Sequence, residues 1–187
     1  MKQSLMLPLV CLALGGCLQV APLPSTGYLP ADAFSTIAVG QDPALAAVQE
    51  AMIAFAYPAR MQGKPAEMAL AIASLDAMAG QFSTGGRWFG MDSLPKQEML
   101  NARTEVRGIL GVPDNAPSQS VIDQLMAASR ALDKGDQNAA LAALSGPDFT
   151  KTPEQTLAIL AHFPRAPIAN SATMNANLNF FPPDSRW

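Results

Sequence analysis

Residues 65–80 read PAEMALAIASLDAMAG, and the organisation of the chain follows from this stretch. Pro65 suits the first position of a helix, because its missing N–H would have no partner there anyway, and Gly80 closes the pattern. Larger apolar residues occur among the alanines all round the expected helix: Met68, Leu70, Ile72, Leu75 and Met78. Only three polar side chains interrupt them: Glu67, Ser74 and Asp76. A helix that is apolar on every side is buried, so this one is expected at the centre of a helical bundle.

Helix-start and helix-stop signals on either side predict further helices. The clearest start is Thr152-Pro153-Glu154-Gln155, which offers a capping box with proline at the first position. Asp42-Pro43 combines a capping carboxylate with proline in the same way. Further expected caps are Asp92 or Ser93, Ser118 and Asp136. Apolar residues at helical spacing then predict helices over residues 43–57 with a kinked continuation to 61, 93–110, 118–134, 137–144 and 153–163, and a short one over 32–39.

The last stretch, residues 164–187, shows a different pattern. Apolar residues alternate with Asn175, Asn177 and Asn179, and the apolar members are Met174, Ala176, Leu178 and Phe180. Asparagine has poor helix propensity, and period-two spacing is typical of an extended chain. We therefore expect an extended tail lying in a groove between helices, with Phe181 and Trp187 pinning its end. The alternative is a free peptide that pairs with a partner as an added strand.

The first residues combine one basic side chain, Lys2, with an apolar run over residues 5–14 that ends in Leu14-Gly15-Gly16-Cys17. This pattern resembles the signal peptide of bacterial lipoproteins. The resemblance covers residues 1–17 only. It implies that residues 1–16 are removed and that the Cys17 thiol carries a diacylglyceryl group. Cys11 is a weaker acceptor because Pro8-Leu9-Val10 before it lacks small residues. With Leu18 after the cysteine, the resemblance implies the periplasmic face of the outer membrane, with the inner membrane as the alternative.

Residues 17–41 read as a lipidated, proline-rich tether. Pro22, Pro24 and Pro30 interrupt the segment, and Ser25-Thr26-Gly27 indicates a turn. Held extended, residues 18–30 would reach about 40 Å and lift a folded body clear of the lipid headgroups. The chain thus divides into a signal peptide (1–16), a tether (17–41), an all-α domain of five or six helices packed as antiparallel hairpins (42–163) and an extended tail (164–187).

The segment around Gly135, LDKGDQNAAL over residues 132–141, resembles the turn between the two helices of a tetratricopeptide repeat. In that family a glycine ends the first helix and small residues let the second helix pack closely. Gly63 lies 72 residues earlier, close to two periods of about 34 residues. A further copy near residue 99 is missing, because Gln97-Glu98-Met99 reads as the middle of a helix. Helical hairpins are therefore expected, and a tetratricopeptide array is not.

Charge and cysteine content exclude several classes of function. The chain has 12 Lys and Arg against 15 Asp and Glu, a net charge of −3, without the basic cluster that nucleic acid requires. Its only cysteines are Cys11 and Cys17, so processing would leave no disulfide. His162 is the only histidine, with no neighbouring ligand, and is interpreted as a helix-terminal residue. We expect no cofactor and no metal.

Catalytic motifs are absent from the sequence. Glu98 and Glu105 share one helix face, but seven residues separate them by about 10 Å along the axis, beyond the usual range for a glycosidase pair. We interpret them as part of a solvated face. No Gly-x-Ser-x-Gly elbow or phosphate-binding loop is present, and the glycines at Ser83-Thr84-Gly85-Gly86 lack the required lysine.

Two groups of residues are candidates for partner binding. Arg87, Trp88 and Phe89 lie between glycines, and these residue types dominate binding hot spots; the alternative is that the rings plug the end of the bundle. Lys96, Arg103 and Arg107 are spaced seven and four residues apart. They would form a basic stripe on one helix, which favours an anionic partner. The alternative is that they belong to a hydrated helix face.

These observations favour a membrane-anchored lipoprotein that binds or scaffolds another envelope protein without catalysis. An envelope glycan hydrolase that uses Glu98 or another carboxylate is one alternative, and it would need a cleft around a carboxylate of raised pKa. A carrier of a small apolar ligand is the other alternative, suggested by the Met- and Ala-rich helices. It would need an internal cavity.

Overall fold

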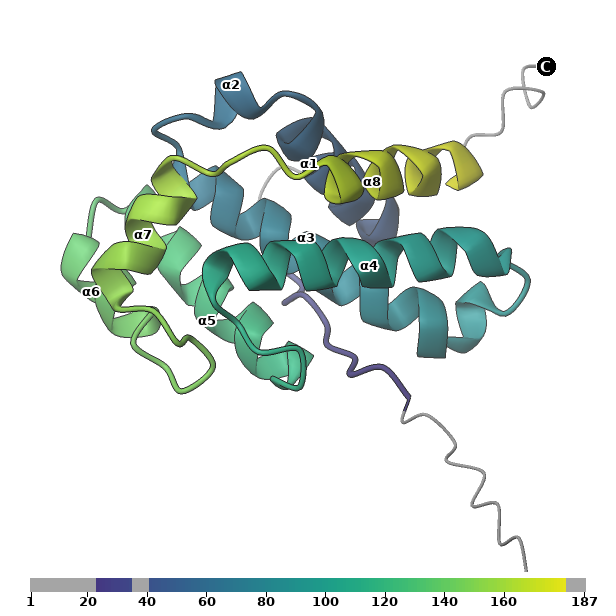
Figure 1. Cartoon of the computed structure of the whole chain (residues 1–187), viewed down its shortest axis with the longest axis horizontal. Coiled ribbons are helices and arrows are strands. Elements are labelled where there is room, and N and C mark those ends of the chain that lie inside the picture. The colour runs from purple at the N-terminus through teal and green to yellow at the C-terminus, as the bar shows by residue number, and fades with distance from the viewer. Residues whose placement is uncertain (1–22, 35–40, 181–187) are drawn as a thin grey trace, which may run out of the picture.

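The computed structural model describes residues 23–34 and 41–180, and within these residues every regular element is helical (Figure 1). The all-α prediction is confirmed. The elements are α1 (Pro43–Ala56), α2 (Pro58–Met61), α3 (Pro65–Thr84), the 3₁₀ turn η1 (Gly86–Trp88), α4 (Ser93–Leu110), α5 (Ser118–Asp133), α6 (Gln137–Ala143), α7 (Pro153–Ala161) and α8 (Pro167–Phe180). None of these helices is both long enough and apolar enough to cross a membrane.

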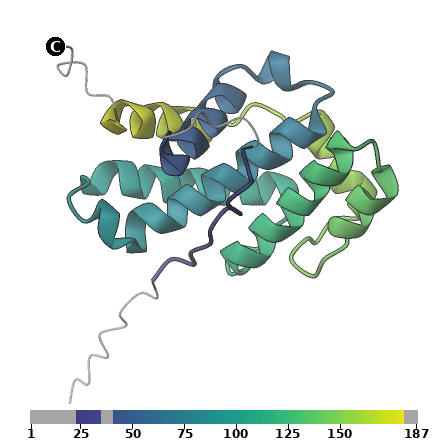
Figure 2. The ribbon, with the colours of Figure 1, turned by 180° about the vertical axis from the view of Figure 1, so that it is seen from behind.

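Helix α3 lies at the centre of the bundle, as its composition predicts. It packs against α1, α4, α5 and α7, which surround it in Figures 1 and 2. Its buried residues are Met68, Ala69, Ala71, Ile72, Ala73, Ser74, Leu75, Asp76, Ala77, Met78, Ala79, Gly80 and Phe82. Gly80 does not end the helix, which continues to Thr84. A glycine is needed at this point because the backbone of Ser25 and Thr26 approaches the helix closely.

Most of the predicted helix caps are present. The Asp42 carboxylate accepts the Ala44 N–H, and the Asp136 carboxylate accepts the Ala139 N–H. Thr152 and Gln155 form the expected capping box of α7. Gly135 has a φ of 75° at the turn that joins α5 to α6, a left-handed conformation in which glycine is favoured. Two expected caps make no such bond. Asp92 precedes α4 without a side-chain cap hydrogen bond, and Ser118 is the first residue of α5; the Ser118 hydroxyl has other partners.

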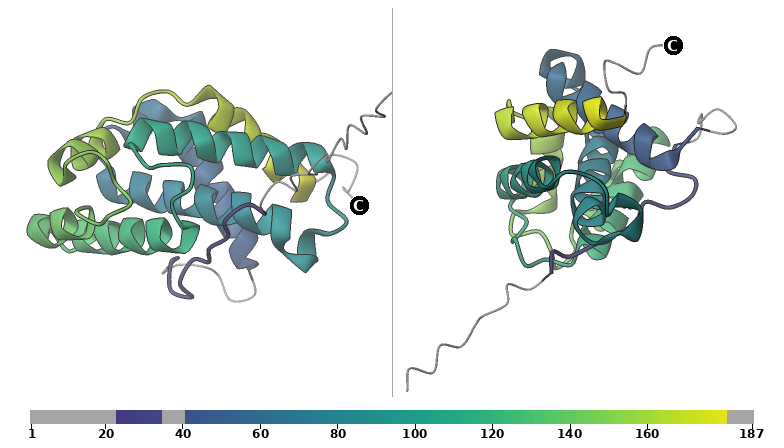
Figure 3. Two further views of the ribbon diagram at one scale, coloured as in Figure 1. Left: turned by 60° about the horizontal axis from the view of Figure 1, so that its bottom comes forward. Right: turned by 90° about the vertical axis from the view of Figure 1, so that its right-hand side faces the viewer.

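The C-terminal segment is not extended, and that prediction is wrong for its described part. Residues 167–180 form α8, which packs on α1 and α4 (Figure 3). Its buried residues recur at helical spacing: Ala169, Ala172, Thr173 and Ala176. Their burial between two helices outweighs the poor helix propensity of the asparagines. Met174 and Leu178, expected in a groove, are exposed. Residues 181–187, with Phe181 and Trp187, lie outside the described residues.

The predicted tether is also corrected. Residues 23–34, which we call the strap, form no helix but lie along α3 and α5 and bond to them. Asp32 of the strap also pairs with Arg130 of α5. Much of the segment expected to hold the body away from the membrane is therefore part of the body. Cys17 and residues 35–40 lie outside the described residues, and so does most of the helix predicted over 32–39.

Candidate functional site

The predicted cluster Arg87, Trp88 and Phe89 divides into two parts. Trp88 is buried at the end of the bundle, with its ring centroid 4.8 Å from that of Phe82 and 5.4 Å from that of Phe180. Arg87 lies over the Trp88 ring and pairs with Asp42. This hydrogen-bonded pairing lowers the pKa of the Asp42 carboxyl, against a smaller opposing effect of burial.

Phe89, in contrast, is 91% exposed. Trp88 therefore fills the end of the bundle, as the structural interpretation of these rings expected, whereas Phe89 remains available to a partner. The two adjacent aromatic residues differ in exposure because η1 is a tight turn, after which the two rings lie in different surroundings.

The predicted basic stripe does not exist as an exposed surface. Arg103 and Arg107 are 8% and 2% exposed, and only Lys96 is partly accessible. Both arginines belong to the inner side of α4, next to the core residues Met99, Ala102, Val106 and Leu110. One feature of the sequence does indicate the burial of these arginines. A single aspartate, Asp76, lies in the apolar helix α3, and a buried carboxylate requires a cation.

Arg107 is the centre of a buried ionic network. Its Nε and Nη2 atoms donate to the two Asp76 oxygens at 2.7 and 3.0 Å, the bidentate geometry that makes arginine–carboxylate pairs strong. Its Nη1 atom donates to the Ala116 carbonyl at 2.9 Å and to the Asp114 carbonyl at 3.1 Å. One side chain thus fixes α3, α4 and the α4–α5 loop together.

Arg103 extends this network to the strap. Its Nη1 atom donates to the Ser25 carbonyl at 2.7 Å and to the Ser118 hydroxyl at 3.1 Å. The Ser118 N–H donates to the Ser25 hydroxyl at 2.9 Å. Burial lowers the pKa of Arg103 and the neighbouring Arg107 adds to this, while Asp76 opposes it. We call Ser25, Arg103 and Ser118 the strap seat, because Ser25 of the strap bonds to both of the other two residues.

Two glycines let the strap lie this close. A Cβ atom on Gly27 would approach the Gln119 backbone nitrogen to 2.8 Å, and one on Gly80 would approach the Ser25 carbonyl oxygen to 2.6 Å. No Cβ tolerates such contacts without movement of the backbone. The Gln119 side chain bonds to both the N–H and the carbonyl of Tyr28. Gly27, predicted to lie in a turn, and Gly80, predicted to end a helix, are therefore the points at which the strap contacts the body.

A groove runs between α4 and α8, and its two hollows share Glu98. One hollow is lined by Glu98, Asn101, Pro167, Ile168, Ser171 and Ala172, and the other by Asp92, Leu94, Pro95, Glu98, Asn175, Leu178 and Asn179. We call this the α4–α8 groove. Of the nine large apolar side chains that are exposed in the described residues, five belong to the 89–94 region or to α8: Phe89, Leu94, Ile168, Met174 and Leu178.

Glu98 and Glu105 hold α8 in place, so their interpretation as a solvated face is wrong. The Glu105 carboxylate accepts the Ala169 N–H in the first turn of α8 at 2.8 Å, where a negative charge is favourable. The Glu98 carboxylate accepts a hydrogen bond from the Asn175 amide at 2.9 Å. These contacts give both carboxylates structural partners, which weakens the glycan hydrolase alternative.

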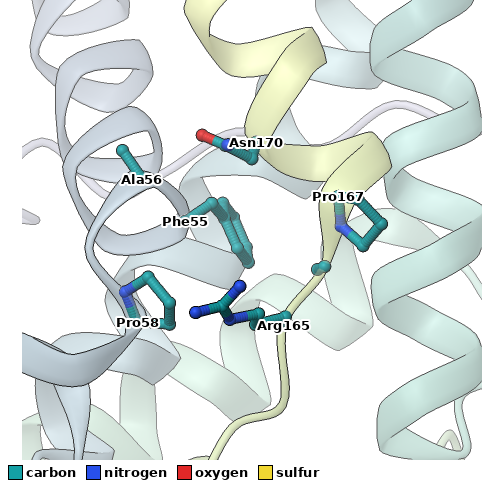
Figure 4. Close-up of a pocket in the computed structure, with 7 residues that line it drawn as sticks. Phe55, Ala56, Pro58, Arg165, Pro167 and Asn170 are labelled. Atoms are coloured by element: carbon teal, nitrogen blue, oxygen red, sulfur yellow. The ribbon is translucent and has the colours of Figure 1, made fainter.

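A smaller hollow lies between the end of α1 and the linker before α8 (Figure 4). Phe55 and Pro58 form one side of it, and the guanidinium group of Arg165 and the amide of Asn170 lie at opposite ends of the Phe55 ring. The hollow offers one cation and one aromatic ring, and no acidic or nucleophilic side chain lines it. This hollow is a surface depression rather than the internal cavity that a carrier of apolar ligands needs.

His162 ends α7, as expected, and its Nδ1 lies 3.1 Å from the Gln62 Oε1. The described residues contain no cluster of three His, Cys, Asp or Glu side chains that could hold a metal ion. Comparisons of the chain with protein-family models, with curated proteins and with solved structures give no match.

Proposed function

We propose that this protein is a lipid-anchored lipoprotein of the bacterial envelope that binds or scaffolds another envelope protein through the α4–α8 groove, without catalysis. The observation that carries the proposal is the set of exposed apolar side chains that line this groove, Leu94 and Leu178 in one hollow and Ile168 in the other. Phe89 is a further exposed apolar side chain, four residues before the start of α4. Exposed apolar groups that are rimmed by polar residues are typical of protein-binding surfaces.

The lining of the groove also constrains the partner. Asp92 and Glu98 supply carboxylates, and none of the residues lining the two hollows is a cation. Asn101 and Asn179 add amides that can donate to and accept from a peptide backbone. A partner segment with aliphatic side chains at its ends and a lysine or arginine between them would complement this surface.

Site-specific photo-crosslinking in intact cells tests the protein-binding proposal. A photo-reactive phenylalanine analogue replaces Phe89 or Leu178, and a matched control places it at Asn138, an exposed residue of α6. We expect one discrete crosslinked protein from the first two positions and none from the control. Equal or absent crosslinking at all three positions contradicts the proposed surface.

The anchor rests on the Leu14-Gly15-Gly16-Cys17 pattern, which is tested separately. Cys17→Ser should leave an unprocessed precursor that lacks the acyl mass of the wild-type protein. Membrane fractionation with an outer-membrane marker then checks the proposed location. Unchanged mass and fractionation in the variant contradict lipidation, whatever the crosslinking shows.

A further inference from the structure

The docked strap shortens the distance between the body and the anchor. The first described residue of the strap is Leu23, only six residues after Cys17. Six residues span at most about 20 Å even when fully extended. The strap therefore limits how far a lipid on Cys17 can lie from the body, whereas a free tether to residue 41 would allow several times that distance.

The strap is fixed to one side of the body by specific contacts. Ser25 bonds to Arg103 and Ser118, and Thr26 bonds to Thr84 at the end of α3. Gly27 and Gly80 provide the close backbone approaches on the two flanks. A single hydrogen bond would let the strap rotate relative to the body. Contacts to α3, α4 and α5 together prevent this rotation.

The side on which the strap begins is opposite α8. Figures 1 and 2 and the right-hand view of Figure 3 show the strap, drawn in purple, beginning below the body, while α2 and α8 lie at the top. Near its beginning, Ser25 is bonded to Ser118, the first residue of α5. The α4–α5 loop belongs to the lower side, because its Ala116 carbonyl and the Ser25 carbonyl are both bonded within the same arginine network.

We infer that the strap orients the body on its membrane, with the side of the body that carries the strap and the α4–α5 loop turned toward the lipid surface and α8 with the α4–α8 groove turned away from it. This inference rests on the proposed lipid anchor, and it adds that the groove is presented to partners across the periplasm. The position is imposed by the length and docking of the chain rather than by attraction between this face and lipid.

The chemistry of the α4–α5 loop agrees with a passive contact. The loop Pro113-Asp114-Asn115-Ala116-Pro117 carries a single charge, and that charge is negative. An electrostatic membrane site would carry clustered lysine or arginine. The orientation should therefore be the same on neutral and on anionic bilayers.

Energy transfer to the lipid surface tests the orientation in the full-length lipidated protein. After processing, the chain has no cysteine except the acylated Cys17, so an introduced cysteine is a unique labelling site. Asn115→Cys places a donor dye on the α4–α5 loop, and Ser171→Cys places it on the exposed side of α8. The acceptor is a headgroup-labelled lipid in phosphatidylcholine vesicles, with or without phosphatidylglycerol.

We expect at least about a twofold higher transfer efficiency from residue 115 than from residue 171 in both lipid mixtures. Gly27→Val, which forces the strap off α5, should reduce this difference, and Gly86→Val, with open space around its Cβ, should preserve it. Equal transfer from the two positions in the wild-type protein overturns the inference. Protein that does not float with the vesicles, or that lacks the acyl mass, overturns the proposed anchor and the orientation with it.

Discussion

The two ends of the described chain are attached to the same core in opposite ways. Helix α8 is held by the burial of small side chains, Ala169, Ala172 and Ala176, between α1 and α4. The strap has no regular structure and is held mainly by hydrogen bonds and by backbone contacts at Gly27 and Gly80, with Leu29 and Phe34 only partly buried against the core. The first attachment is part of the hydrophobic core, whereas most polar groups in the second would find water as a replacement partner if the strap were removed.

Deleting each end separately should produce the largest contrast. A chain that stops after Pro164 lacks α8 and exposes the apolar sides of α1 and α4, so we expect loss of cooperative unfolding in thermal melts followed by circular dichroism. A chain that starts at residue 35 should still unfold cooperatively, with its melting temperature lowered by a few degrees, since about 1 kcal/mol corresponds to 2–4 °C in a protein of this size. The reverse order of effects would contradict the comparison.

The ionic network beneath the strap should be the next most sensitive feature. Asp76→Ala leaves Arg103 and Arg107 buried without their carboxylate, and breaking a buried pair costs about 3–5 kcal/mol. The matched change is Asp42→Ala, which breaks the far more exposed pair with Arg87; exposed pairs contribute about 0.2–1 kcal/mol, and the Ala44 cap adds about 1 kcal/mol. Urea unfolding measures both. Equal losses would mean that the Asp76 network is not buried.

The effect of Gly80→Ala on the free energy of unfolding should have opposite signs in the presence and in the absence of the strap. In the full chain the new Cβ meets the Ser25 carbonyl and the Thr26 Cα at 2.6 and 2.8 Å, so the variant should be less stable by about 1–3 kcal/mol. In the chain that starts at residue 35, the same change replaces a helical glycine by alanine and should stabilise by about 0.5–1 kcal/mol. The same sign in both backgrounds would show that the strap does not touch α3.

The smallest effect concerns Glu50, which lines a hollow with Asp32, Ala33 and Phe34 at the end of the strap. Burial raises the pKa of the Glu50 carboxyl above its ordinary 4.5, and Glu67 adds to this effect. The folded protein therefore binds this proton more tightly than the unfolded chain, and stability falls as pH rises through the raised pKa. Glu50→Gln should be slightly more stable than wild type at pH 7, and the advantage should vanish below about pH 4.5 in melts recorded across pH. If the Gln variant is still more stable than wild type at pH 3.5, the difference does not come from the charge of Glu50.

The helices are predictable from the sequence because their signals are local. Prolines, capping side chains and apolar spacing fix where α1, α3, α4 and α7 begin, and the composition of residues 65–80 places α3 in the centre. The sequence does not predict α8 because it carries two patterns. Large apolar residues alternate with asparagines, which favours an extended chain, while small residues recur at helical spacing. Burial against the neighbouring helices decides for the helix.

The candidate sites depend on partners that are distant in sequence. Arg103 and Arg107 look like surface residues until Asp76, about 30 positions earlier, is placed opposite them. Gly27 and Gly80 are each compatible with a turn or a helix end, and their true role requires knowing that residue 27 meets α5 and that residue 80 meets residues 25 and 26. Long-range contacts of this kind leave no periodic pattern in one sequence.

Amide hydrogen exchange at Tyr28 tests the docked strap most directly. Its N–H donates to the Gln119 side chain at 2.8 Å, a bond made only when the strap lies on α5. We predict that this amide exchanges at least about tenfold more slowly than in an unstructured peptide, and that Gly27→Val removes the protection while the amides of α3 stay protected. Exchange of the wild-type Tyr28 amide at the rate of a free peptide would contradict the docked strap and the orientation derived from it.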